Sequence, residues 1–301
     1  MKALIFNIER HALHDGPGIR TLIFFSGCTL HCLWCSNPEG QKYQPRLMFR
    51  SKDCTGCGKC IPTCPHNAIS MTDKGIAATD RTRCDACGRC ISVCPVNARQ
   101  IAGREMTVDE VMEVVLKDEV FYRHSGGGVT ASGGEPLANA QFLKELFYSC
   151  KTHGVHTAVE TCGFVPWNSF ELIIPYTDLF LFDVKHVDTE IHKEYTGAGC
   201  ETILDNLKKL DLAGKNITVR VPVIPGFNSS VEDIRKIVGH VKKYKNVKEV
   251  HLLPYHRLGL PKYRGLEMDY PLEHLEPLDM EIAKELIHKV DEKDIKILLD
   301  V

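Results

Sequence analysis

The strongest signal in this chain is the stretch GPGIRTLIFFSGCTLHCLWCSNPE, residues 16–39. It contains an apolar run at 20–26 that is typical of a strand buried on both faces of a sheet. Three cysteines follow the run directly: Cys28, Cys32 and Cys35, with the spacing C-x3-C-x2-C. A strand that leads into three closely spaced thiols predicts a metal-binding loop at the carboxyl end of a parallel sheet.

Three thiolates are one fewer than a fully ligated [4Fe–4S] cluster needs, so one iron would keep an open position. An open coordination position distinguishes a catalytic metal site from a structural one. A ligand with an amine and a carboxylate, such as the methionyl end of S-adenosylmethionine, could chelate that iron. Its sulfonium would then lie beside the cluster, where one electron breaks a carbon–sulfur bond. The alternative is a zinc site completed by His31, whose side chain we expect to point away from the thiolates.

An internal repeat with a period of thirty residues forms the second signal. CTGCGKCIPTCPHNAI begins at residue 54 and CDACGRCISVCPVNAR begins at residue 84. Each copy has the spacing C-x2-C-x2-C-x3-C-P of bacterial ferredoxins, in which the fourth cysteine of each run ligates the other cluster. The expected ligand sets are Cys54, Cys57, Cys60 and Cys94 for one [4Fe–4S] cluster, and Cys84, Cys87, Cys90 and Cys64 for the other. Two structural zinc sites are the alternative. Clusters with four protein ligands only store and pass electrons, so the repeat predicts an electron-transfer segment.

Composition limits the class of protein. The chain has 301 residues, of which 44 % are apolar and 25 % charged, and a formal net charge of −2. This balance gives no field that would attract nucleic acid or anionic lipid. The sequence has no apolar run of about 20 residues and no signal peptide pattern. We therefore expect a cytoplasmic monomer without nucleic-acid or membrane partners. In that reducing compartment the fourteen cysteines are more consistent with metal ligands than with disulfides.

Strands and helices alternate in the rest of the chain. Buried strands are expected at 20–26, 128–133, 155–160, 178–184, 217–223 and 247–253, and helices at 107–119, 138–153, 167–174, 202–213 and 231–243. A last helix at 279–290 leads to a last strand at 295–300. This order predicts an α/β fold with a parallel sheet, doubly wound or closed into a partial barrel. The expected organisation is one domain of residues 1–50 and 101–301, with residues 51–100 inserted as a ferredoxin-like module.

Polar residues stand at the carboxyl ends of these strands, where parallel β/α barrels collect their functional groups. Asp183 and Lys185 lie two residues apart and so share one side of the extended chain. A buried structural ion pair is the alternative for them. Arg220, between valines, needs an anionic partner, for which the carboxylate of S-adenosylmethionine is suitable. Trp34 stands where an aromatic ring could pack against adenine, and local core packing explains it equally well.

These residues resemble those of a known family. The pattern C-x3-C-x-aromatic-C resembles that of the radical S-adenosylmethionine enzymes. More narrowly, residues 16–39 resemble the signature of the glycyl-radical enzyme activating enzymes, and the inserted repeat resembles their larger members, which activate lyases and dehydratases. The resemblance implies a partial (β/α)6 TIM-like barrel and three [4Fe–4S] clusters. It also implies that a 5′-deoxyadenosyl radical, formed with an electron from flavodoxin or ferredoxin, removes an α-hydrogen from a glycine of a partner enzyme.

The resemblance also implies contacts with S-adenosylmethionine. Gly133-Gly134-Glu135 resembles the family's motif for the methionyl amine, and Asp183-x-Lys185 its motif for the ribose and carboxylate. His256 matches an adenosine-contacting position, although a lone histidine is often structural. The expected cofactor-binding residues are Trp34, Asn37, Gly133, Gly134, Glu135, Asp183, Lys185, Arg220 and His256. Glu160 stands where small members have an aspartate, so a cation site near Glu160 and Asp183 is left open.

Two other functions fit parts of the pattern. One is a radical S-adenosylmethionine enzyme that acts on a small molecule or a peptide. The other is an iron–sulfur electron carrier, which would leave Asp183, Lys185 and Arg220 at the strand ends unexplained.

Overall fold

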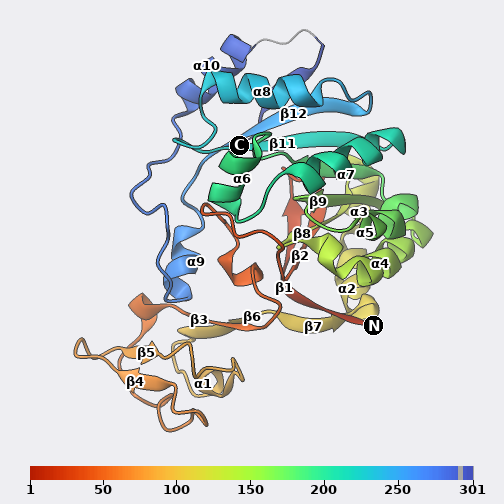
Figure 1. Cartoon of the computed structure of the whole chain (residues 1–301). Coiled ribbons are helices and arrows are strands. Elements are labelled where there is room, and N and C mark those ends of the chain that lie inside the picture. Colours follow the sequence, from red (N-terminus) through yellow and green to blue (C-terminus); the bar gives the residue numbers. More distant parts are fainter. Residues whose placement is uncertain (291–293, 301) are drawn as a thin grey trace.

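The computed structural model describes residues 1–290 and 294–300. Its centre is a nine-stranded sheet in the order β13-β12-β11-β10-β9-β8-β2-β1-β7 (Figure 1). Within this order, the strands from β13 through β2 all run parallel to one another. They are β2 (Arg20–Phe25), β8 (Gly128–Gly133), β9 (His156–Thr161), β10 (Leu179–Asp183), β11 (Ile217–Val223), β12 (Val247–Pro254) and β13 (Lys296–Leu299). Each lies within one or two residues of a predicted strand, because continuous apolar runs define strands buried on both faces.

Helices alternate with these strands, as expected for a partial (β/α) barrel. They are α2 (Val108–Val115), α3 (Glu119–Ser125), α4 (Ala140–Thr152), α5 (Trp167–Ile173), α6 (Thr189–Thr196), α7 (Glu201–Leu212), α8 (Val231–Val241) and α10 (Met280–Val290). Neighbouring helices contact one another along the outside of the sheet: α2 with α4, α4 with α5, and α8 with α10. Ser230 caps α8 by accepting a hydrogen bond from the Asp233 backbone N–H.

The helix predicted at 107–119 is divided in the structure. A capping box between Thr107 and Glu110 starts α2 as expected, but α2 ends at Val115 and a 3-10 turn, η3 (Leu116–Asp118), precedes α3. The Asp118 carboxylate is fully buried and accepts a hydrogen bond from the Thr21 hydroxyl at 2.8 Å. This contact with β2 explains the break, because it fixes Asp118 against the sheet. The short helices α6 and α9 (Leu260–Gly265) were not predicted.

Two antiparallel strands extend the sheet beyond β2. Strand β1 (Lys2–Ala12) pairs with β2 on one side and with β7 (Arg104–Thr107) on the other. The chain therefore leaves the barrel after β2, passes through the cysteine repeat, and returns to the same sheet edge in β7 (Figure 1).

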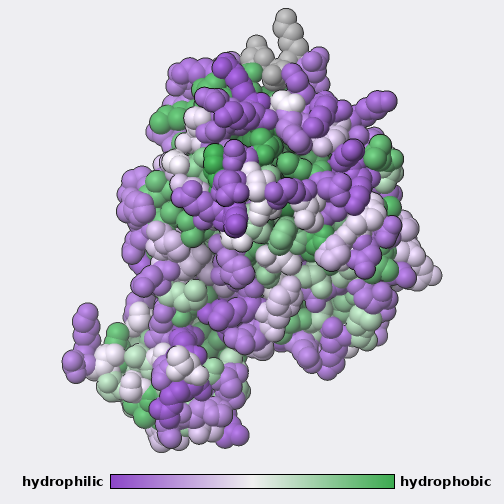
Figure 2. All heavy atoms as spheres, viewed as in Figure 1, coloured by the Kyte–Doolittle hydropathy of each residue, from purple (hydrophilic) through white to green (hydrophobic). Residues whose placement is uncertain are grey.

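The cysteine repeat forms a separate lobe beside the barrel, at the lower left of Figure 1. Strands β3 (Arg46–Phe49) and β6 (Arg99–Ala102) pair at its base, and β4 (Ile69–Met71) pairs with β5 (Ala77–Thr79). A short helix, α1 (Arg89–Ser92), completes it. The lobe has its own small apolar core, formed by Leu47, Phe49, Ile69, Ala77, Cys90 and Ala98. On the face shown in Figure 2 its surface is mostly hydrophilic.

Helix α9 connects this lobe with the first cysteine loop. Arg81 of the lobe donates to the carbonyl of Gly265, the last residue of α9, at 3.2 Å, and to the carboxylate of Glu267, just after α9, at 2.5 Å. Within α9, the Lys262 ammonium lies 2.7 Å from Asn37 Oδ1 and 2.9 Å from Glu39 Oε1. The lobe is thus fixed to the segment that follows Cys35.

Among the helices of residues 1–290 and 294–300, none has the length and apolar character that crossing a membrane requires.

Candidate functional site

A cavity of about 570 Å³ opens at the carboxyl ends of the parallel strands. Its volume lies in the range of small-molecule binding sites. All six strands from β2 to β12, or the loops that follow them, contribute to its walls. The predicted residues that line it are Cys28, Cys32, Trp34, Cys35, Asn37, Gly133, Gly134, Asp183, Lys185, Arg220 and His256.

Backbone hydrogen bonds fix the loop that carries the first three cysteines. Gly27, at φ +97°, donates to the Gly40 carbonyl at 2.7 Å, which turns the chain out of β2. The His31 N–H donates to the carbonyl of Thr196 at the end of α6, at 2.8 Å. The His31 side chain is exposed, in agreement with its expected direction. The loop therefore presents its cysteines to the cavity from one side.

The donor set of this loop fits an iron–sulfur cluster. Burial raises the pKa of the Cys32 thiol to about 12 and also raises the pKa of Cys35. Free thiolates are therefore unfavourable here, although the ammonium of Lys185 lowers the Cys32 pKa in part. Iron bound at this place would supply the positive charge that stabilises the thiolates. Three cysteines at one wall of an open cavity leave room for a further ligand on the metal.

The repeated cysteines of the lobe surround two smaller hollows. One hollow is lined by Cys54, Cys57, Cys60 and Cys94. The other is lined by Cys64, Cys84, Cys87 and Cys90. Each hollow thus brings together one of the two predicted ligand sets, with the fourth cysteine supplied by the other copy of the repeat.

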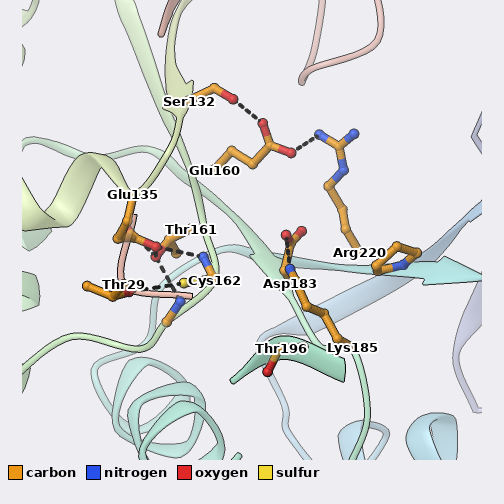
Figure 3. A network of polar contacts seen from close by, with 12 residues as sticks. Thr29, Ser132, Glu135, Glu160, Thr161, Cys162, Asp183, Lys185, Thr196 and Arg220 are labelled. Carbon is orange, nitrogen blue, oxygen red and sulfur yellow. Dashed lines mark hydrogen bonds and ion pairs between the residues drawn. The ribbon is translucent and has the colours of Figure 1, made fainter. Parts of the chain in front are cut away.

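Buried charges from β9, β10 and β11 form a network in the wall of the large cavity (Figure 3). Arg220 of β11 lies 3.1 Å from Asp15 Oδ1 and 3.2 Å from Glu160 Oε1. Ser132 donates a short hydrogen bond to the other oxygen of Glu160. Burial alone would lower the pKa of Arg220, but Glu160, Asp183 and Asp15 raise it above its ordinary value. The guanidinium is therefore a permanent cation at the end of β11.

A second ion pair lies beside Arg220. The Lys185 ammonium is 2.6 Å from Asp183 Oδ2, and Lys185 is only 6 % exposed. Asp183 Oδ1 and Arg220 Nε are buried and have no hydrogen-bond partner within the described part of the chain. Buried polar atoms are normally paired, so these two atoms indicate a missing ligand. A hydroxyl or ammonium group would satisfy the carboxylate, and a carboxylate would satisfy the guanidinium.

Glu135 differs from the prediction. Its side chain is fully buried, and both carboxylate oxygens accept hydrogen bonds, from the backbone N–H groups of Leu137 and Cys162 and from the Thr161 hydroxyl. The carboxylate therefore supports the cavity wall and does not face the ligand space. A charge pattern in the sequence could not reveal this direction, because the partners lie on the next strand.

The glycines before Glu135 bring two strand ends together. Gly133 has φ +114°, and a Cβ there would lie 2.5 Å from the Phe25 backbone nitrogen. A Cβ on Gly134 would lie 2.3 Å from the Gly27 carbonyl oxygen. The two glycines thus allow the end of β8 to lie very close to the end of β2 and the start of the cysteine loop. This close packing places the backbone of Gly133 and Gly134 beside the site of the cluster.

Trp34 and His256 occupy different depths of the cavity. The Trp34 ring is 8 % exposed and packs 4.8 Å from the Phe227 ring between centroids. Trp34 is therefore a core residue that also lines the cavity. His256 is exposed, at the end of β12.

Some lining residues were not among the predicted site residues: Asp15, Ser132, Cys162, Tyr255 and Lys262. Asp15 directly precedes the Gly-Pro-Gly turn, and that position is the only sequence signal for it. Lys262 comes from α9, more than two hundred residues from the loop that it contacts, so no local pattern could identify it.

Comparisons with known proteins agree with this geometry. The profile of the radical SAM superfamily matches residues 82–238, and that of the 4Fe-4S dicluster domain matches residues 53–110. The choline trimethylamine-lyase activating enzyme of Oleidesulfovibrio alaskensis is 43 % identical over 298 residues, which cover 96 % of each chain. The trans-4-hydroxy-L-proline dehydratase activating enzyme of Clostridioides difficile is 40 % identical, and 95 % of each chain is covered. The (2S)-3-sulfopropanediol dehydratase activating enzyme of Klebsiella oxytoca is 39 % identical, over 90 % of this chain and 88 % of its own.

Among solved structures, Streptococcus suis SuiB bound to precursor peptide SuiA aligns with a TM-score of 0.55. The alignment covers 95 % of this chain and 49 % of that chain at 13 % identity, so it supports the fold alone. The superfamily match, the relatives of nearly full length and the cavity with its three cysteines agree on one assignment. This chain belongs to the glycyl-radical enzyme activating enzymes of the radical SAM superfamily, whose site takes a [4Fe–4S] cluster and S-adenosylmethionine.

Proposed function

We propose that this chain holds its catalytic cluster on Cys28, Cys32 and Cys35, and that it binds S-adenosylmethionine in the cavity beside them. The observation that carries the proposal is that the three thiols line the same cavity as the buried Asp183–Lys185 pair and Arg220. When bound, the two cofactors supply a 5′-deoxyadenosyl radical, which removes an α-hydrogen atom from a glycine of the partner enzyme.

The charges of the cavity favour this cofactor. Asp15, Glu160 and Asp183 face Lys185 and Arg220, which leaves one net negative charge when all are ionised, and Glu9 and Lys262 offset each other. S-adenosylmethionine carries one net positive charge, from its sulfonium, ammonium and carboxylate groups. Electrostatic complementarity of this kind strengthens binding in a cavity that excludes water.

We assign the contacts as follows. Arg220 binds the methionyl carboxylate through its free Nε, and Asp183 accepts a hydrogen bond from a ribose hydroxyl or the ammonium group. The backbone of Gly133 and Gly134 contacts the methionyl end. His256 and Trp34 contact the adenosine, and Asn37 completes the site beside Cys35.

The lobe supplies electrons in this proposal. Residues 51–100 form a module with two [4Fe–4S] clusters on the two crossed cysteine sets, inserted into a domain of residues 1–50 and 101–301, and the loaded protein holds three clusters. Exposed lysines precede, interrupt and follow the first cysteine run in sequence, at positions 52, 59 and 74. Their charge suits an acidic donor such as flavodoxin or ferredoxin.

The partner is a glycyl-radical enzyme of the lyase or dehydratase type, in line with the names of the relatives. A glycine loop of the partner enters the open mouth of the cavity. The protein acts as a monomer in this proposal. We place the protein in the cytoplasm, because exposed iron–sulfur clusters need a reducing compartment.

Transfer of the radical to a partner tests this function. The reconstituted, reduced protein is incubated without oxygen with S-adenosylmethionine and a candidate glycyl-radical lyase from the same organism, and that lyase is examined by electron paramagnetic resonance. We expect a glycyl radical on the partner, and none with Cys32→Ala. Consumption of S-adenosylmethionine without a radical on that lyase would contradict the proposal and favour a small-molecule or peptide substrate.

A further inference from the structure

The two copies of the cysteine repeat differ at one buried position. Ile69 ends the first copy and Arg99 ends the second, thirty residues later. Ile69 lines the hollow of the Cys84 set, and Arg99 lines the hollow of the Cys54 set. The same position of the repeat therefore puts an apolar side chain beside one cluster site and a cation beside the other.

Arg99 is a buried cation for which residues 1–290 and 294–300 provide no ion pair. The residue is 2 % exposed, and its guanidinium carbon lies 4.4 Å from the centre of the Phe49 ring. Its Nη1 donates to the Thr79 hydroxyl at 2.9 Å, whereas Nη2 has no hydrogen-bond partner within residues 1–290 and 294–300. A buried guanidinium is unfavourable unless an anion compensates it. A cluster on the Cys54 set, whose hollow Arg99 lines, is an anion that would compensate this cation. Burial raises the pKa of Cys90 in the other set and the charge of Arg99 lowers it in part, so the two clusters differ in how directly they face this cation.

The other hollow is arranged differently. Asp85 and Arg89 lie at its rim, and both are exposed, so that water screens their opposite charges. Asp85 accepts a hydrogen bond from the Cys87 backbone N–H at 3.0 Å and lies 2.9 Å from His66 Nε2. No buried cation corresponding to Arg99 occurs among the residues described for this hollow.

We propose that Arg99 raises the reduction potential of the cluster on Cys54, Cys57, Cys60 and Cys94 above that of the cluster on Cys64, Cys84, Cys87 and Cys90. Reduction adds one negative charge to a cluster, and a buried cation stabilises that charge in a medium of low dielectric constant. The inference rests on the ligand sets of the proposed function. It adds that the two clusters of the lobe have unequal reduction potentials, so that the cluster on the Cys54 set is reduced first.

The position of the Cys54 cluster in the lobe gives the difference in reduction potential a function in electron transfer. Strand β3 leaves the barrel at Arg46, and its partner strand β6 returns at Ala102. Leu47, near that base, lines the hollow of the Cys84 set, whereas Phe49, two residues farther out, lines the hollow of the Cys54 set. The cluster that is reduced first is therefore the outer one, which collects electrons from the donor.

A redox titration of the full chain tests the inference. The three loop cysteines are replaced by alanine (Cys28→Ala, Cys32→Ala, Cys35→Ala), so that only the lobe clusters contribute to the electron paramagnetic resonance signals. We expect two one-electron steps and about eight irons per chain. Arg99→Met should lower the reduction potential of the upper step by at least about 59 mV. For a one-electron couple this corresponds to a tenfold change in the equilibrium constant.

Three further variants separate charge from structure. Arg99→Lys keeps the charge and should retain most of the upper potential. Thr79→Val removes only the hydrogen bond to Arg99 and should leave both steps in place. Cys57→Ser changes a ligand of the outer cluster and should move the same step that Arg99→Met moves.

The outcomes are distinct. An unchanged upper step in Arg99→Met with full iron content, or a shift of the lower step instead, would overturn the role of Arg99 alone. If Arg99→Met loses iron, Arg99→Gln, which still donates to Thr79, is titrated with the same expectation. Absence of iron from the triple-alanine background would contradict the ligand sets themselves, and thereby the proposed function of the lobe.

Discussion

Arg220 Nη1 lies 3.1 Å from Asp15 Oδ1, although 205 residues separate the two side chains in the sequence. This ion pair attaches the segment before the Gly-Pro-Gly turn to the fifth parallel strand. Glu160, at 3.2 Å from the same guanidinium, adds β9 to the contact. One arginine therefore joins three parts of the chain at the wall where the cofactor carboxylate is expected.

Replacement of Arg220 should affect both stability and cofactor binding. Arg220→Met leaves the carboxylates of Asp15 and Glu160 without their cation in a buried place. We expect a loss of about 3 kcal/mol in the free energy of unfolding. We also expect at least tenfold weaker binding of S-adenosylmethionine, since a charge-assisted hydrogen bond is lost. Denaturant titration and anaerobic calorimetry measure the two effects.

Arg123→Met is the matched control, because Arg123 pairs with Glu119 on an exposed helix face. It should cost less than about 1 kcal/mol and leave cofactor binding unchanged. Equal effects of the two substitutions would contradict the role given to Arg220.

The turn at Gly133 should not tolerate a side chain. Gly133→Ala places a Cβ about 2.5 Å from the Phe25 nitrogen at φ +114°, so β8 and the end of β2, from which the cysteine loop starts, must separate. Gly154→Ala is the control, because Gly154 also has positive φ (+68°) but no atom within 4 Å of the added Cβ. The control should cost about 1–2 kcal/mol from backbone strain alone. Gly133→Ala should cost more and also reduce the iron bound at the loop, measured in protein whose lobe cysteines are intact. Comparable stability and iron content in both variants would count against the close approach.

The stability of the sheet edge should depend on pH through His251. A hydrogen bond that His251 donates to the Asp300 carboxylate, together with one to Glu249, raises the pKa of His251 despite its partial burial. A group with a raised folded-state pKa contributes fully below its unfolded pKa, about 6.5, and the contribution disappears as pH rises through the folded value. The difference in unfolding free energy between the unsubstituted protein and His251→Gln should therefore shrink between about pH 6 and pH 9. A difference that stays constant or grows over this range would show that the ion pairs of His251 do not form.

The sequence predicted the parallel strands well, because continuous apolar runs are a local property. It also grouped the repeated cysteines as they are found around the two hollows of the lobe, while the cluster ligands themselves stay a prediction. Tertiary contacts explain what it missed. The break after α2 depends on the contact of Asp118 with Thr21 of β2. The direction of Glu135 depends on Thr161, the last residue of β9, and on Cys162, which follows it. Asp15 belongs to the site because the fold places Arg220 of β11 beside it. Such partners are distant in sequence, so spacing and composition do not reveal them.

Cleavage of S-adenosylmethionine by the isolated protein tests the central claim most directly. The reconstituted protein, with about twelve irons, is reduced with dithionite in the absence of oxygen and given S-adenosylmethionine, and 5′-deoxyadenosine is measured by chromatography. We expect formation of 5′-deoxyadenosine by the unsubstituted protein and none by Cys32→Ala, whose lobe clusters stay intact. No product from protein that holds the full complement of iron, or equal product from Cys32→Ala, would contradict a catalytic cluster on Cys28, Cys32 and Cys35.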